Sequence, residues 1–134
     1  MRSNHSRGTA IVLACLFAGA AFAADVDAKL HAYKSASTEA NSVMGQIKDG
    51  ATARALQAKL DAALKKHREA EAALNDELKK LNLKDPKDGK TMESAMGEIA
   101  KANEAMSKEQ LRIYSNKDAA EVVHKSIDAT PAKK

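Results

Sequence analysis

Aromatic and sulfhydryl side chains are scarce in this chain of 134 residues, which contains no tryptophan and a single cysteine. Cys15 and both phenylalanines lie in the first 23 residues, so Tyr33 and Tyr114 are the only aromatic side chains after them. Residues 24–134 therefore have no thiol. A disulfide framework, a thiolate metal site and a cysteine nucleophile are excluded in that part of the chain.

The first 23 residues have the composition of a cleaved signal peptide. Arg2 and Arg7 provide positive charge, and residues 10–20 form an apolar run that is short for a bilayer span. Residues 21–23, Ala-Phe-Ala, match the small-x-small motif after which signal peptidase cuts. We therefore expect cleavage after Ala23 and a periplasmic or secreted protein.

Lipidation at Cys15 is the alternative outcome of processing, because the residues that precede it, Val-Leu-Ala, match a lipoprotein motif. The apolar segment before that cut would be shorter than the roughly seven residues that a signal peptide requires. Cleavage after Ala23 is therefore the favoured prediction.

The chain after residue 23 carries little net charge. The whole chain has 22 basic and 18 acidic residues, and loss of Arg2 and Arg7 lowers its net charge from +4 to +2. Lysine and glutamate are interleaved, whereas nucleic-acid binding uses a clustered basic face or stacking aromatic side chains. We therefore expect no binding to nucleic acid. No second long apolar run is present, so we expect no membrane span. We expect one domain at residues 24–129 and a disordered tail at residues 130–134.

Apolar residues recur every three or four positions in three segments, which is the period of an amphipathic helix. These segments are residues 26–47, 56–81 and 92–113. Short loops between long amphipathic helices make consecutive helices antiparallel. The sequence therefore predicts an all-α fold, an up-down antiparallel bundle of three long helices, or of four with a break near Ser115. Alanine at many core positions predicts a thin core.

Turn and capping residues mark the ends of these helices. Gly50 follows the first segment and tolerates the left-handed turn that often ends a helix. Thr52 is the predicted N-cap of the second helix, and Asp85 and Pro86 are the predicted N-cap and first residue of the third. Ser115 begins a Ser-x-x-Asp capping box, so a separate short helix starts there if the third helix breaks.

His67 lies on the apolar stripe of the second helix. Antiparallel register places it opposite Tyr33 or Lys34, and the next loop brings Met106 near. We favour a structural histidine that is hydrogen-bonded to the Tyr33 hydroxyl. The alternative is a histidine and methionine pair that binds copper or haem iron.

Two further groups of residues have the chemistry of metal ligands. Glu121 and His124 have the spacing used in di-iron bundles, but such sites need two such pairs and two further glutamates. The methionines suit copper(I), and they equally suit irregular core gaps or binding grooves. We therefore expect no cofactor and no metal. The candidates for the alternative of copper or haem are His31, His67, Met106, Glu121 and His124.

Small exported four-helix bundles include haem carriers. His31 near the start of the mature chain and His124 near its end resemble the ligand layout of cytochrome b562, in which one haem ligand comes from the first helix and one from the last. His31 stands where that family has methionine. The resemblance covers size, export and these end positions, and it implies noncovalent haem because no Cys-x-x-Cys-His motif occurs. If residues 92–128 form one helix, the two histidines lie at opposite ends. Only a fold-back at Ser115 brings them together.

The sequence offers little support for catalysis. It has no glycine-rich phosphate loop, no nucleophile beside a base and no carboxylate pair on an apolar face. We therefore expect that the protein is not an enzyme.

Beyond Met106 the apolar residues of the third segment become sparse. We expect Ile113, Ala120, Val123 and Ile127 to form an exposed spine that docks another envelope protein or a second copy. The sequence thus predicts an exported interaction module of a chaperone-like, inhibitor or immunity type. A metal- or haem-binding bundle is the alternative.

Overall fold

The computed structural model describes the backbone of residues 10–130 and the side chains of residues 23–130. This part of the chain contains no strand and forms four helices, which are α1 (Ala10–Gln46), α2 (Gly50–Leu78), α3 (Pro86–Tyr114) and α4 (Lys117–Asp128). The predicted all-α bundle is therefore confirmed, in its four-helix form. As far as the chain is described, none of these helices combines the length and apolar character needed to cross a membrane. Residues 1–9 of the predicted signal peptide and 131–134 of the predicted tail lie outside the described residues.

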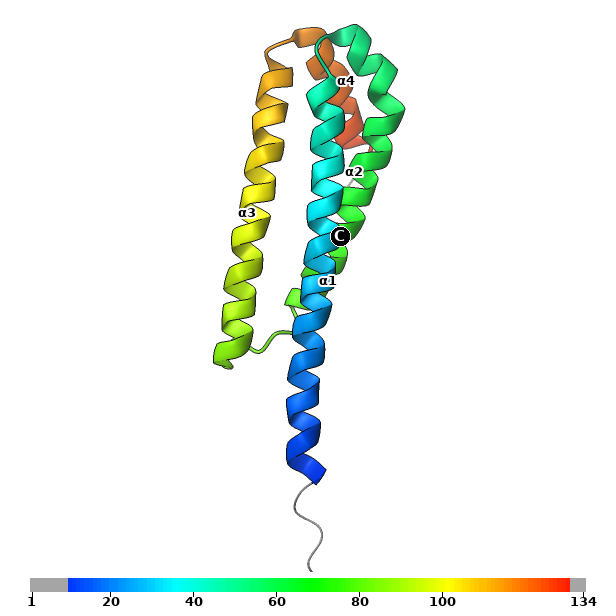
Figure 1. Ribbon diagram of the computed structural model, residues 1–134. Coiled ribbons are helices and arrows are strands. Elements are labelled where there is room, and N and C mark those ends of the chain that lie inside the picture. The colour runs from blue at the N-terminus through cyan, green and yellow to red at the C-terminus, as the bar shows by residue number, and fades with distance from the viewer. Residues whose placement is uncertain (1–9, 131–134) are drawn as a thin grey trace, which may run out of the picture.

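Consecutive helices run in opposite directions, and α1 lies between α2 and α3 (Figure 1). Arg112, near the end of α3, reaches the carbonyl oxygens of Met44 and Ile47 at the end of α1, so α1 and α3 run parallel. α4 packs mainly against α2 and only slightly against α3. α3 therefore has one principal neighbour, α1, and stands at an edge of the bundle.

The apolar core consists of two clusters because α4 is much shorter than the other helices. All four helices enclose the first cluster, whereas α1, α2 and α3 enclose the second. Met44 and Leu60 are fully buried in the first cluster, and Leu74 is fully buried in the second. Small side chains let the helices of the first cluster approach closely, and its buried alanines are Ala40, Ala53, Ala63 and Ala119.

α2 begins with a reciprocal cap between Asp49 and Thr52. The Thr52 backbone amide donates to Oδ1 of Asp49 at 2.8 Å, and the Asp49 amide donates to Oγ1 of Thr52 at 3.0 Å. Asp49 is therefore the N-cap, and the prediction that Thr52 has this role is wrong by three positions. The Asp49 carboxylate accepts from a backbone amide that the first turn of the helix leaves free, and the Thr52 hydroxyl accepts from the Asp49 amide.

The predicted capping residue is correct for α3 and wrong for α4. Asp85 caps α3 with Pro86 in its first turn, as predicted. α4 is capped by Asn116, whose side chain accepts from the Ala119 amide at 3.1 Å, and not by Ser115. Ser115 still has helical backbone angles at the end of α3, whereas an N-cap residue needs the extended conformation that Asn116 adopts.

Gly50 occupies a position where the sequence predicts a left-handed turn, but no residue of the described chain has a positive φ. Gly50 is instead the first residue of α2, buried against the start of α4. A Cβ atom on this residue would lie 2.7 Å from the Cβ of Asp118. The close approach of two helix N-termini, and not a turn, therefore requires glycine here.

Two arginines cap the carboxyl ends of neighbouring helices. The Arg112 guanidinium donates to the carbonyl oxygens of Met44 at 2.7 Å and Ile47 at 2.8 Å. Arg68 of α2 donates to the carbonyl oxygen of Ile127 at 2.9 Å, near the end of α4. Each guanidinium adds a donor to carbonyl oxygens at the carboxyl end of a helix and complements the negative end of that helix. These bonds tie α3 to α1 and α4 to α2.

Candidate functional site

The four residues predicted to form an exposed spine are largely covered in the structure. Ile113 is 2% exposed and Val123 is 0% exposed, and both belong to the first apolar cluster. Ile127 packs against the same cluster, and Ala120 is half-buried. The expectation of exposure is wrong because the chain breaks after α3 and α4 folds back onto α2, while the end of α3 packs on α1. These contacts supply the missing apolar neighbours.

A buried polar layer lies where the two apolar clusters meet. The rings of Tyr33 and His67 have centroids 5.0 Å apart, so the predicted layer is confirmed. The predicted hydrogen bond between them is wrong: the Tyr33 hydroxyl donates to Oδ1 of Asn103 on α3 at 2.8 Å. Nε2 of His67 is buried and has no hydrogen-bond partner among the described residues. The sequence pattern alone does not single out Asn103, although it lies one turn before Met106, which the predicted register places nearby.

Burial governs the electrostatics of this layer. Desolvation lowers the pKa of His67 below its ordinary value, while the nearby Glu71 carboxylate acts in the opposite direction. Desolvation also raises the pKa of Tyr33. Ser37, one turn along α1, donates its hydroxyl proton to the Tyr33 carbonyl oxygen at 2.9 Å. The layer is therefore uncharged near neutral pH, and its polar groups hold α1, α2 and α3 in register.

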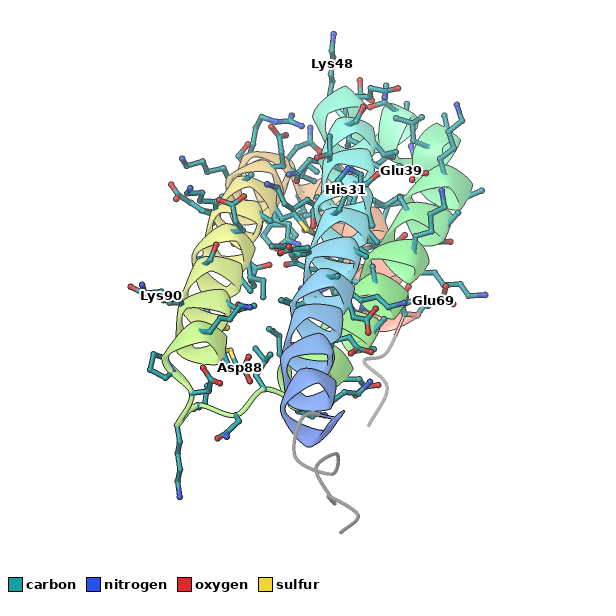
Figure 2. The ribbon with its side chains drawn as sticks, turned by 60° about the horizontal axis from the view of Figure 1, so that its bottom comes forward. His31, Glu39, Lys48, Glu69, Asp88 and Lys90 are labelled. Atoms are coloured by element: carbon teal, nitrogen blue, oxygen red, sulfur yellow. The ribbon has the colours of Figure 1, made fainter. Side chains whose placement is uncertain are left out.

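The remaining histidine candidates lie on different helix surfaces. Figure 2 shows His31 on α1, where it borders a shallow hollow lined by residues of α1 alone. His124 is exposed on α4, with Nε2 3.3 Å from Oδ2 of Asp128. Glu121 pairs instead with Nζ of Lys125 at 2.8 Å. The fold-back near Ser115 does occur, but α1 and α4 are not among the principal helix contacts.

The methionines are also dispersed. Met44 and Met106 are buried in the first cluster, Met92 packs against the second, and Met96 is 52% exposed. Within the residues that the structure describes, no three histidine, cysteine, aspartate or glutamate side chains gather as a metal site would require. The candidate metal ligands of the sequence are thus not brought together as a set.

The most distinctive exposed feature is one face of α3. Among the described residues, the large apolar side chains that are well exposed are Leu83, Met96, Leu111 and Tyr114, and the last three lie on this helix. Their helical spacing aligns them with two small exposed residues. We call this surface the α3 outer face, and its residues are Met96, Ala100, Ser107, Leu111 and Tyr114.

Charged residues border the α3 outer face without interrupting it. Glu104 and Lys108 lie along one side and form an ion pair of 2.7 Å, with side chains that are 66% and 73% exposed. On the other side, Asn103 lies between the face and the core, where it accepts the Tyr33 hydroxyl bond. The face is therefore an uncharged strip about five helical turns long, by the 3.6 residues of each turn.

The sequence indicates this face only in part. The apolar period of residues 92–113 assigns Ala95 and Met96 alike to the core stripe, but Ala95 is buried and Met96 is exposed. Leu111 and Tyr114 were not singled out. Their spacing from Ser107, at four and seven positions, was the signal that could have found them.

Comparison of the chain with protein-family models, with curated proteins and with solved structures gives no match.

Proposed function

We propose that this protein is an exported interaction module of the cell envelope, which contacts a protein partner through the α3 outer face. The observation that carries the proposal is the alignment of Met96, Leu111 and Tyr114, all well exposed, on one uncharged strip of an edge helix. Clustered apolar side chains on a surface are typical of protein contact sites. A helix that presents such a strip docks against a groove or another helix.

Export is the second part of the proposal, and it is supported by the order of charge, apolar run and small-x-small motif in residues 1–23. Val26 is the first buried residue among the side chains that the structure describes. Cleavage after Ala23 therefore leaves every buried residue among the described side chains in the mature protein.

Many polar side chains of the bundle have a structural role, because they fix the helices relative to one another. Arg68 and Arg112 bind helix carbonyl groups, and the Tyr33 hydroxyl is bound to Asn103. Most surface charges with a partner pair within one helix turn, as Glu121 and Lys125 do. These side chains hold helices in place, and we therefore assign recognition to the α3 outer face.

Site-specific photo-cross-linking in living cells tests the proposal. A photoreactive residue at position 111 replaces an exposed leucine of the α3 outer face, and the same residue at position 83 replaces an exposed leucine outside it. We expect cross-linked protein products from position 111 and none from position 83. Absence of products from position 111, or equal yields from both positions, contradicts the proposal.

Metal or haem binding is the second candidate function, and one observation favours it. Nε2 of His67 is buried and unpaired within the described chain, which leaves this nitrogen available as a ligand atom. An absorption spectrum and metal analysis of the protein purified from its native envelope test this function. A metal or a Soret band that is lost in His67→Gln supports it, and a colourless, metal-free protein contradicts it.

A further inference from the structure

We infer that the partner of the α3 outer face is a second copy of this chain, with the two α3 helices packed antiparallel about a two-fold axis that crosses this face at the level of residues 105 and 106. This inference rests on the proposed function, since it names the occupant of the same surface. Three features support it: the order of large and small side chains, the placement of the bordering charges, and the position of α3 at the edge of the bundle.

The α3 outer face is complementary to its own reverse. In an antiparallel two-fold pair, residues at equal distances on either side of the axis meet. Met96 lies nine positions before Ala105 and Tyr114 lies nine positions after it, so each methionine meets the partner's Tyr114. Ala100 lies five positions before Ala105 and Leu111 lies six after it, so Ala100 comes within one position of the partner's Leu111. A small residue facing a large one allows the two surfaces to interdigitate. A thioether against an aromatic ring is a favourable contact.

The bordering charges select the antiparallel arrangement. Glu104 and Lys108 lie on the same side of the α3 outer face and are largely exposed. A two-fold axis perpendicular to the paired helices places Glu104 of one copy beside the partner's Lys108, and Lys108 beside the partner's Glu104. A parallel two-fold pair would instead place this charged side of one copy beside the opposite side of its partner, so Glu104 and Lys108 would not pair across the contact.

The edge position of α3 leaves room for a second copy. Ala95, Met106 and Ile113 point into the core, and the α3 outer face is turned away from them by roughly a third of a helical turn. α4 packs mainly on α2. A second α3 can therefore lie alongside the first without displacing α1 or α4.

Charge-reversal variants test both the partner and the arrangement. We expect sedimentation equilibrium of the whole protein to detect a reversible dimer. Glu104→Lys places two lysines against two lysines across the axis, and Lys108→Glu places two glutamates against two glutamates. Each variant alone should weaken self-association by about tenfold or more. An equimolar mixture should regain the affinity of the unchanged protein, because each lysine of one variant then meets a glutamate of the other.

Unchanged helicity and thermal midpoints in dilute solution show that both variants fold, as the exposure of these side chains predicts. Three results overturn the inference: a monomer up to millimolar concentration, single variants that associate normally, or a mixture that does not recover. A monomer that is nevertheless cross-linked from position 111 to a different protein refutes self-association alone. Loss of every cross-link from position 111 refutes the proposed function as well.

Discussion

The imidazole ring of His67 lies 5.0 Å from the phenol ring of Tyr33, with the two ring planes inclined at 44°. This contact joins α1 to α2 at the level where the two apolar clusters meet. The Tyr33 hydroxyl continues the layer to Asn103 of α3. Three helices are therefore linked through neutral polar groups in an otherwise apolar interior.

Stability should fall in mild acid because of His67. Burial lowers the folded-state pKa of His67, so the unfolded chain binds more protons below the unfolded value of about 6.5. The stability that comes from burying His67 in its neutral form is fully present above that pH, and it is lost as the pH falls toward the lowered pKa. Urea unfolding at about pH 7 and pH 5.5 measures the loss, which we expect to shrink in His67→Gln.

The matched control for this experiment is His124→Gln, which removes an exposed histidine of α4. We expect this variant to keep the full acid sensitivity of the unchanged protein. The interpretation of His67 is contradicted if His67→Gln loses as much stability between the two pH values as the unchanged protein does.

The sequence predicts the parts of this fold that depend on neighbouring residues. The apolar period predicts the helices, and Asp85 with Pro86 predicts the start of α3, because these signals act within one helical turn. The short loop before α2 sets the hairpin register, which is why Tyr33 and His67 meet as predicted. Local patterns therefore account for the helices and for the first helix pair.

Contacts between distant segments were not predictable in the same way. Ile113 and Val123 have few apolar neighbours in sequence, but the fold joins them to distant residues of α1 and α2, such as Met44 and Leu60, in the first apolar cluster. The α3 outer face was missed for a related reason. Whether Ala95 or Met96 enters the core depends on the rotation of α3 against α1, which an apolar pair at adjacent positions does not define.

Substitution by alanine should have opposite effects on stability at Gly50, which is closely packed, and at Gly97, which has open space around it. Gly50→Ala places a Cβ atom 2.7 Å from the Cβ of Asp118, so we expect a loss of about 1–3 kcal/mol from overpacking. Gly97, inside α3, has no atom within 4 Å of an added Cβ, and Gly97→Ala should stabilise the protein by about 0.5–1 kcal/mol. Denaturant unfolding measures both values, and stabilisation by both substitutions would refute the proposed approach of α2 and α4.

We predict that signal peptidase gives the exported protein a single, defined N-terminus. Mass spectrometry of protein recovered from the envelope or medium should give a chain that begins at Ala24, because residues 21–23 carry the small-x-small motif. A diacylated chain that begins at Cys15 would instead establish a lipoprotein. A full-length chain retained in the cytoplasm would contradict export altogether.

The claim that two copies meet through the α3 outer face is tested most directly by methyl NMR spectra recorded from dilute to concentrated protein. The methyl groups of Met96 and Leu111 belong to this face, whereas those of Leu83 are exposed elsewhere and serve as the internal reference. We predict that the Met96 and Leu111 signals shift together with concentration while the Leu83 signals stay constant. Constant Met96 and Leu111 signals, or a shift confined to Leu83, would contradict it.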